Sequence, residues 1–419
     1  MQKPKADLLI DNTTELITCI PTGSDPLGRI QNGAVAVAGG RILATGSRAD
    51  LEQRLDLTGT QVLDTQGKIV APGFVDCHTH LIFGGSRVKE YALKMTRSLA
   101  EIEAMGLKTG IPASIAMTRE ASEEDLFLGA LDRLGRMLHY GTTTVESKSG
   151  YGISWPAELK MLRVNQRLAQ AQPVDVVSTF LGAHDFPPEM DREDPNQRKA
   201  YIRELTQEMI PRVAQDNLAA FCDIYCDVGY YTAGESEIVL RAGMDHGLAP
   251  RIHTDAYANI GGSTLAATLP AVSADHLNYT SENEMRHLAQ NNVVGVVLPA
   301  LDFAVAHPDP FDARPMLKAG MTLALGTNLN PGNWTESMQL VMQLACRNHG
   351  MAPEEAMLAA TTGAARAIQR HHQIGCLAEG YAADIQIWDL PCFEDVIYRI
   401  GNNAVWMVIK NGKIIVRNR

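Results

Sequence analysis

The chain has 419 residues, of which 45% are apolar and 20% charged, a composition typical of a globular protein with a large core. Its formal net charge of −11 argues against nucleic acid or an anionic membrane surface as a partner. The first residues lack the apolar segment of a secretion signal, and no apolar run is long enough to span a membrane. Seven scattered cysteines without a Cys-x-x-Cys motif favour free thiols in a reducing compartment, so we expect a cytoplasmic protein.

Short β-like runs occupy both ends of the chain. In the first seventy residues they lie at 8–10, 17–20, 34–37, 41–44 and 61–63. Near the other end, 383–388 alternates between apolar and polar residues, and 405–415 contains a hairpin signal at Asn411-Gly412. We therefore expect one small β-sandwich domain built from residues 1–70 and 371–419.

The middle of the chain alternates between apolar strand-like runs and amphipathic helical stretches. The clearest helical stretches are 122–139, 157–171 and 195–213, and Ser122 with Asp125 resembles a capping box. Near-continuous apolar strands separated by helices indicate a parallel sheet, and eight such units close into a (β/α)₈ barrel over residues 71–370. The eight strands are expected at 74–81, 142–149, 174–185, 220–227, 250–256, 272–278, 293–300 and 322–330.

Histidines gather where these strands end, which is where such barrels carry their chemistry. His78 and His80 lie on either side of one residue at the end of the first strand. Alternate residues of a strand share a face, so both imidazoles can hold one ion. His253, at the end of the fifth strand, is the third expected ligand. Imidazole nitrogens suit one divalent metal, Zn²⁺ in preference to Fe²⁺. An open position on that metal would activate water for hydrolysis.

Two further histidines are expected to act on the substrate. His276, at the sixth strand end, is a candidate acid/base or carbonyl polariser, and its alternative role is to support a ligand. His184, after the third strand, is expected to face the substrate as a hydrogen-bond donor.

Three loops at the same barrel mouth offer groups that bind anions. Arg87 follows the first strand and suits a carboxylate, and Tyr151 could bring a phenol to the same anion. Asn330 and Gly332 follow the eighth strand and offer turn amides. Their convergence predicts a small anionic substrate.

Several motifs together resemble the amidohydrolase superfamily, and within it the imidazolonepropionase branch. They are the Pro-Gly-Phe-Val-Asp-x-His-x-His run, the segments 78–87, 143–152, 181–184, 273–277 and 330–332, and the Gly-x-Leu-x-x-Gly-x-x-Ala-Asp-Ile run at 375–385. The resemblance implies hydrolysis of 4-imidazolone-5-propanoate, a five-membered ring with a propionate tail, to N-formimino-L-glutamate. Enzymes of this class are often homodimers, so we expect one here.

The resemblance assigns roles by position. His78, His80 and His253 match the metal ligands of the family, and His276 matches its catalytic histidine. Substrate contacts are implied for Arg87, Tyr151 and His184. The fourth strand does not end in the lysine that binuclear relatives carry, so the resemblance implies a single metal.

The chain departs from the family at three places. Asn328 stands where the family has an aspartate that touches the metal and takes a proton from its water; an asparagine oxygen can still bind the metal, but it cannot accept a proton. We therefore expect Asn328 to be a metal ligand in the catalytic site without the function of a base. Ala256 replaces a Gln or Glu that reaches the substrate ring, and residues 104–111 replace a glycine-rich run.

These departures surround the reacting ring, so three functions remain open at this stage. The first is a hydrolase acting on an imidazolone or hydantoin-type ring with a propionate tail. The second is a related desulfhydrase that acts on a 2-thioxo-hydantoin propionate, as arises in ergothioneine breakdown, and releases sulfide. The third is a binding protein that has lost catalysis.

Overall fold

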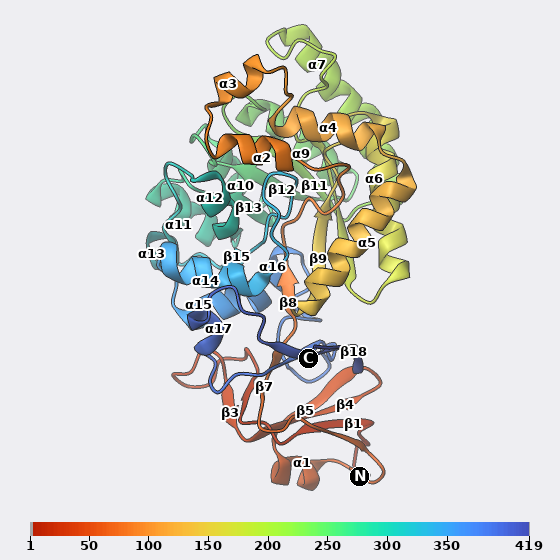
Figure 1. Ribbon diagram of the computed structural model, residues 1–419, viewed down its shortest axis with the longest axis vertical. Helices are drawn as coiled ribbons and strands as arrows, with labels where there is room; N and C mark the ends of the chain where they lie inside the picture. Colours follow the sequence, from red (N-terminus) through yellow and green to blue (C-terminus); the bar gives the residue numbers. More distant parts are fainter. Residues whose placement is uncertain (1–2, 419) are drawn as a thin grey trace.

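The computed structural model describes residues 3–418 and consists of a barrel joined to a smaller β unit (Figure 1). The barrel sheet has eight parallel strands in sequential order. This confirms the (β/α)₈ prediction. The strands are β8 (Phe74–Asp76), β9 (Thr142–Lys148), β10 (Asp175–Ala183), β11 (Phe221–Cys226), β12 (Ala249–Thr254), β13 (Ser273–His276), β14 (Val294–Val297) and β15 (Leu323–Leu325).

Residues that follow the first and last of these strands close the barrel. The amide of Asn328 donates to the carbonyl of His78 at 3.0 Å, and the amide of His80 donates to the carbonyl of Leu329 at 2.9 Å. Strands β8 and β15 end several residues before the predicted 81 and 330, because these residues leave strand geometry where they enter the site. Asn328 itself has a φ of +48°.

Helices surround the barrel and cover its apolar outer face. Ser122 caps α5 by accepting from the Asp125 amide, as expected. The predicted helix 195–213 is interrupted by a π-helical segment, Leu205–Met209, between α7 and α8. The helices around the barrel are α5 (Glu123–His139), α6 (Trp155–Ala171), α7 (Pro195–Glu204), α8 (Ile210–Gln215), α9 (Ala233–Asp245), α10 (Gly262–Thr268), α11 (Glu282–Gln290), α12 (Pro299–Val305), α13 (Ala313–Lys318), α14 (Met338–Asn348), α15 (Pro353–Leu358) and α16 (Ala364–Ala367), with a second π segment at Ala359–Gly363 and α17 (Asp395–Tyr398) after it.

Three further helices lie between β8 and α5. They are α2 (Val88–Lys94), α3 (Leu99–Ala104) and α4 (Gly110–Glu120), and Figure 1 shows them at the end of the barrel opposite the β unit. Among residues 3–418, no helix has both the length and the apolar character needed to cross a membrane.

The β unit has two sheets and takes strands from both chain ends, as predicted. One sheet has the order β5-β4-β1-β6, and the other has the order β18-β17-β16-β7-β2-β3. The strands, with one helix, are β1 (Leu8–Asp11), β2 (Glu15–Ile17), β3 (Arg29–Gln31), β4 (Gly33–Ala38), β5 (Arg41–Ser47), α1 (Arg48–Arg54), β6 (Gln61–Asp64), β7 (Ile69–Pro72), β16 (Ile385–Trp388), β17 (Val405–Lys410) and β18 (Lys413–Arg417).

Side chains of both sheets share one buried cluster that includes Leu8, Val37, Ile385 and Ile409, which is the core of a sandwich. The run predicted as a strand at 17–20 is strand only up to Ile17, because the chain turns at Cys19, where φ is +55°. The predicted boundary after residue 70 falls inside β7, and the domain limits stay a prediction.

Candidate metal centre and active site

Five imidazoles meet at the carboxyl ends of the barrel strands. They belong to His78, His80, His184, His253 and His276, and none is more than 7% exposed. The ring centres of His78 and His253 lie 4.6 Å apart, and those of His253 and His276 lie 5.3 Å apart. His80 stacks on His184 with 4.7 Å between ring centres. The structure thus brings together the histidines that the sequence analysis selected.

The donor atoms of this cluster could hold a metal ion. One ligand atom each of His78, His253 and His276 lie within 4.8 Å of one another. Four buried atoms of the cluster have no hydrogen-bond partner among the described residues: Nε2 of His78, Nε2 of His253, Nδ1 of His80 and Oδ1 of Asn328. Buried polar atoms without partners are costly, and a bound cation would satisfy them.

This group of donors contains His276 in place of the expected His80, and a second group within the same limit is formed by Asp223, His253 and Asp275. The ring centre of His80 lies 5.6 Å from those of His78 and His253. The assignment of the metal ligands therefore stays a prediction.

Two buried aspartates orient the metal-site imidazoles. Oδ2 of Asp275 lies 2.6 Å from Nδ1 of His78, and Oδ1 of Asp223 lies 3.1 Å from Nδ1 of His253. Because a carboxylate accepts, each Nδ1 carries the proton and each Nε2 keeps its lone pair. This arrangement of carboxylate, histidine and open nitrogen is typical of metal centres.

Two buried cations hold these carboxylates in the charged form. Nζ of Lys148 lies 2.8 Å from Asp223, 3.0 Å from Glu146 and 3.7 Å from Asp275. Nη2 of Arg251 lies 2.9 Å from Asp275. Burial alone would raise the pKa of Asp275, but the charges of Arg251 and Lys148 outweigh it and lower that pKa. Both aspartates are thus acceptors that stay ionised.

Asn328 lies directly beside the first histidine pair. Its side chain is buried at 3% exposure, and its backbone amide binds the His78 carbonyl. Gly326, two residues earlier, must lack a side chain, because an added Cβ would lie 2.7 Å from Cβ of His78. The contacts place Asn328 beside His78, and its role as a metal ligand stays a prediction.

His276 is a neutral imidazole at the mouth of the barrel. Burial lowers its pKa to about 3, and no hydrogen bond to its ring is found within residues 3–418. Its φ of +86° is unusual for a residue with a side chain, and such strain is concentrated at functional sites.

His184 presents an acceptor to the pocket, which differs from the expected donor. Its Nδ1 lies 3.0 Å from the carbonyl oxygen of Gly150, and a carbonyl can only accept, so Nδ1 carries the proton. Burial lowers the pKa of His184 to about 3, so the ring is neutral and Nε2 keeps a lone pair. The contact with Gly150 favours an acceptor at Nε2, and the expected donor role toward the substrate stays a prediction.

Arg87 is held in place by Glu90, one turn along α2. Its Nε and Nη2 each donate to a Glu90 oxygen at 2.7 Å. Glu90 also accepts from Lys94 at 2.6 Å and from the Gly110 amide at 3.2 Å. Nη1 of Arg87 is not bonded to Glu90 and lies beside Gly332. A Cβ added at Gly332 would lie only 3.0 Å from this nitrogen. The expected clamp therefore has one nitrogen left for a ligand.

Asn330 shapes the loop and does not offer its side chain to a ligand. Its Oδ1 accepts from the amides of Gly332 and Asn333 at 2.7 and 3.0 Å, and its Nδ2 donates to the Asn328 carbonyl at 2.8 Å. These contacts use the Asn330 side chain within the loop, and the expected substrate contacts of Asn330 and Gly332 stay a prediction. The loop instead supports Asn328 and leaves room for Arg87.

Tyr151 is fixed by the loop that carries it. The buried carboxylate of Glu158 accepts from the amides of Gly150, Gly152 and Ile153, all within 3.2 Å. The phenol lies with its ring centre 5.2 Å from that of His184, and burial raises its pKa. Tyr151 is therefore a neutral donor beside the histidines.

The segment after His253 is fixed through its backbone. Asp227 accepts from the amides of Ala256 and Tyr257 at 2.7 and 3.0 Å, and Nε2 of His307 donates to the Ala256 carbonyl at 2.8 Å. The methyl group of Ala256 cannot supply the polar contact that the family's Gln or Glu makes.

Sequence reasoning did not assign roles to the residues that hold the site. These are Lys148, Glu158, Asp223, Tyr225, Arg251 and Asp275. Asp223 and Tyr225 alternate along β11 and precede the strand end, whereas the prediction concentrated on the final residues. The alternation itself was the signal that could have found them.

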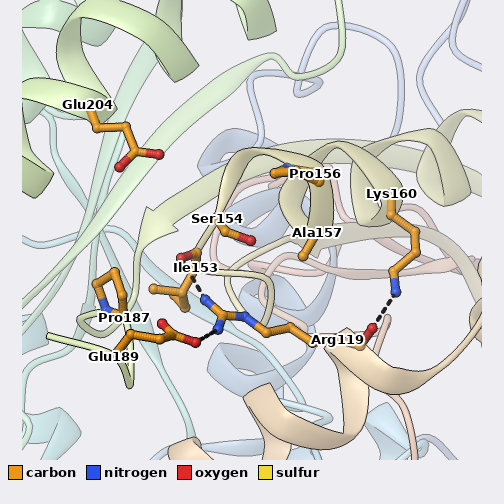
Figure 2. Close-up of a pocket in the computed structure, with 9 residues that line it drawn as sticks. All are labelled: Arg119, Ile153, Ser154, Pro156, Ala157, Lys160, Pro187, Glu189 and Glu204. Carbon is orange, nitrogen blue, oxygen red and sulfur yellow. Dashed lines mark hydrogen bonds and ion pairs between the residues drawn. The ribbon is translucent and has the colours of Figure 1, made fainter.

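A surface pocket of about 580 Å³ lies outside this cluster (Figure 2). Arg119 crosses it and donates to the carbonyls of Gly152 and Ile153 at 2.7 and 2.9 Å, with an ion pair to Glu189. Lys160 donates to the Arg119 carbonyl at 3.1 Å. The pocket therefore backs the Tyr151 loop and holds none of the predicted site residues.

Known proteins resemble this chain over nearly its full length. A model described as amidohydrolase family matches residues 69–415, and one described as imidazolonepropionase-like composite domain of bacteria matches residues 33–55. Imidazolonepropionases of Geobacillus kaustophilus and Geobacillus thermodenitrificans are 41% and 43% identical, with 98% of each chain covered. That of Streptococcus gordonii is 39% identical over 92% of this chain and 91% of its own.

Solved structures share the fold at lower identity. An adenosine deaminase of Xanthomonas campestris with bound zinc superposes with a TM-score of 0.72 at 20% identity, covering 99% of this chain and 93% of that one. A triazine hydrolase from Arthrobacter aurescens gives 0.70 at 17% identity, covering 99% and 95%. The matched family model and the full-length relatives lead to one conclusion: the chain belongs to the amidohydrolase family, among its imidazolonepropionases.

Proposed function

We propose that this protein hydrolyses 4-imidazolone-5-propanoate to N-formimino-L-glutamate. The observation that carries the proposal is the set of buried, unpartnered donor atoms at the barrel mouth, on a chain 41% identical to a named imidazolonepropionase. The desulfhydrase alternative has no support in the named relatives, and sulfide release is the result that would favour it.

We propose one divalent metal, zinc in preference to iron, held by His78, His80, His253 and Asn328. The fit rests on Nε2 of His78, Nε2 of His253 and Oδ1 of Asn328, which are buried without partners among residues 3–418. A bound metal would lower the pKa of a water molecule and polarise the ring carbonyl. All four proposed ligands are neutral, three imidazoles and one amide, so they would not offset the positive charge of the metal.

The groups around the centre would hold the substrate by its two ends. Nη1 of Arg87 is the nitrogen not used by Glu90, and with the Tyr151 phenol it would bind the propionate carboxylate. Nε2 of His184 would accept a hydrogen bond from a ring N–H. These contacts orient the ring carbonyl toward the imidazoles.

His276 would transfer the proton. Water adds to the ring carbonyl carbon, the amide C–N bond breaks, and that carbon becomes the new carboxylate. The neutral imidazole of His276 accepts a proton from the water and returns it to the departing ring nitrogen. Asn328 cannot share this work, since an amide oxygen does not accept a proton in the working pH range.

The experiment offers purified protein two ring compounds. Loss of 4-imidazolone-5-propanoate and appearance of N-formimino-L-glutamate are followed by mass spectrometry after metal removal and after reloading with Zn²⁺ or Fe²⁺. Turnover that needs the metal is expected, with zinc giving the higher rate. Sulfide released from the 2-thioxo-hydantoin propionate without turnover of the imidazolone would overturn the proposal, as would binding without turnover of either compound.

We also propose a cytoplasmic homodimer. All seven cysteines are free thiols, four of them buried, which suits a reducing compartment. Light scattering coupled to gel filtration tests the dimer, and fractionation of cells tests the location.

A further inference from the structure

One buried tyrosine faces the histidine cluster without a role in the proposed chemistry. Tyr225 lies two residues after Asp223 on β11, so both side chains point to the barrel interior. Its strand partner in the parallel register is His253. The side chain is buried, with 6% of the residue exposed.

The Tyr225 ring contacts three imidazoles of the site at once. Its centre lies 5.8 Å from that of His253, 6.1 Å from that of His184 and 6.3 Å from that of His276. The planes of Tyr225 and His276 differ by only 18°. The tyrosine therefore forms part of the wall around the position of the reacting ring.

The Tyr225 hydroxyl, like that of Tyr151, has no hydrogen-bond partner within residues 3–418, whereas three other tyrosines have one. Tyr201 donates to the Gly182 carbonyl at 2.8 Å, Tyr231 to that of Asp185 at 3.0 Å, and Tyr381 to that of His371 at 2.9 Å. The Tyr225 oxygen is not one of the fully buried unpartnered atoms, so it is accessible and can donate to a ligand beside the imidazoles.

The position of the ring is restricted by its surroundings. Tyr230 packs on Tyr225 with 4.1 Å between ring centres and 32° between planes. The turn between them is held by Asp227, which accepts from the Val228 amide at 2.7 Å. Burial raises the pKa of Tyr225, so its hydroxyl remains a donor at neutral pH.

We propose that Tyr225 is a further substrate-contacting residue, whose hydroxyl donates a hydrogen bond to an acceptor atom of the five-membered ring. The inference rests on the proposed function. It also gives the ring a polar contact that Ala256, with only a methyl group, cannot supply. Tyr225 thus helps to select a ring that carries an acceptor on the side facing β11.

The test compares Tyr225→Phe with Tyr381→Phe, which removes a hydroxyl in the 374–383 segment next to the β unit. Losing one neutral hydrogen bond to substrate should lower kcat/KM about 3- to 10-fold. The inhibition constant of the product N-formimino-L-glutamate should rise by a similar factor, and melting temperature and metal content should stay unchanged. Tyr381→Phe should match the wild type in kcat/KM and in product inhibition.

Two results separate this inference from the proposed function. If the wild type does not turn over the imidazolone, the proposed function fails. If the wild type is active and Tyr225→Phe keeps the same kcat/KM and the same product inhibition, the role of Tyr225 is refuted while the function stands.

Discussion

Replacing Asn328 with aspartate would test the metal centre most directly. The two side chains have the same shape, and Asp tolerates the left-handed φ of +48° about as well as Asn. The backbone contact from Asn328 to the His78 carbonyl would persist. The substitution therefore adds one negative charge and one proton acceptor at an atom that is buried without a partner.

The expected magnitudes follow from that burial. Without metal, an uncompensated buried charge should destabilise the protein by about 3 kcal/mol. For a chain of 419 residues that lowers the melting temperature by about 3–4 °C. With metal bound, the carboxylate faces a cation and the loss disappears. A general base beside the water should also raise kcat by about 10²-fold or more.

The assay is calorimetry of metal-free and zinc-loaded protein, followed by steady-state kinetics. Asn165→Asp is the matched control, because Asn165 on α6 is 2% exposed and its Oδ1 also lacks a partner. That control should destabilise both metal states equally. If Asn328→Asp leaves the metal-induced rise in melting temperature unchanged, Asn328 does not lie at the metal. A lower kcat at full metal content would show that the added carboxylate does not act as a base.

Three further predictions concern the residues that support the site. Asp223→Asn should weaken metal binding about 10- to 100-fold, because Nδ1 of His253 loses its carboxylate partner. Titration with a chelator followed by metal analysis would measure the affinity. An unchanged affinity would contradict this prediction. Glu90→Gln should raise KM with little change in kcat because Arg87 loses its fixed position, whereas a fall in kcat alone would point to another role. Arg87 and Lys94 lower the pKa of Glu90 from 4.5 to about 2, so its stabilisation is complete above pH 4.5 and is lost as the pH falls toward 2. The melting temperatures of wild type and Glu90→Gln should therefore converge between pH 6 and pH 3, and parallel curves would refute this.

The barrel could be predicted from sequence because its signals are local. Each strand is a short apolar run followed by a polar residue, so β9 and β11 were located within a residue or two. The ends of β8 and β15 were less accurate, because His78 and Asn328 continue the chain without strand geometry. The site histidines could also be predicted from sequence, because they are the polar residues that end these local apolar runs.

The contacts that fix the site are long-range, and one sequence does not contain them. Lys148 and Asp223 are 75 residues apart yet lie 2.8 Å from each other. The tautomer of His184 depends on a carbonyl 34 residues away, so its change from expected donor to acceptor needed coordinates. Arg87 and Glu90 are neighbours on one helix, and that pair could have been anticipated from the i,i+3 spacing.

The charges beneath the cluster explain why position 328 matters so much. Three buried carboxylates, Glu146, Asp223 and Asp275, face two buried cations, Lys148 and Arg251, which leaves one excess negative charge. A divalent metal above them brings the total to +1, because Asn328 contributes no charge. An aspartate at that position would bring the total to zero, making the metal a weaker Lewis acid while supplying a base. In the proposed mechanism the metal would therefore be more electrophilic than beside an aspartate, and His276 would take the proton.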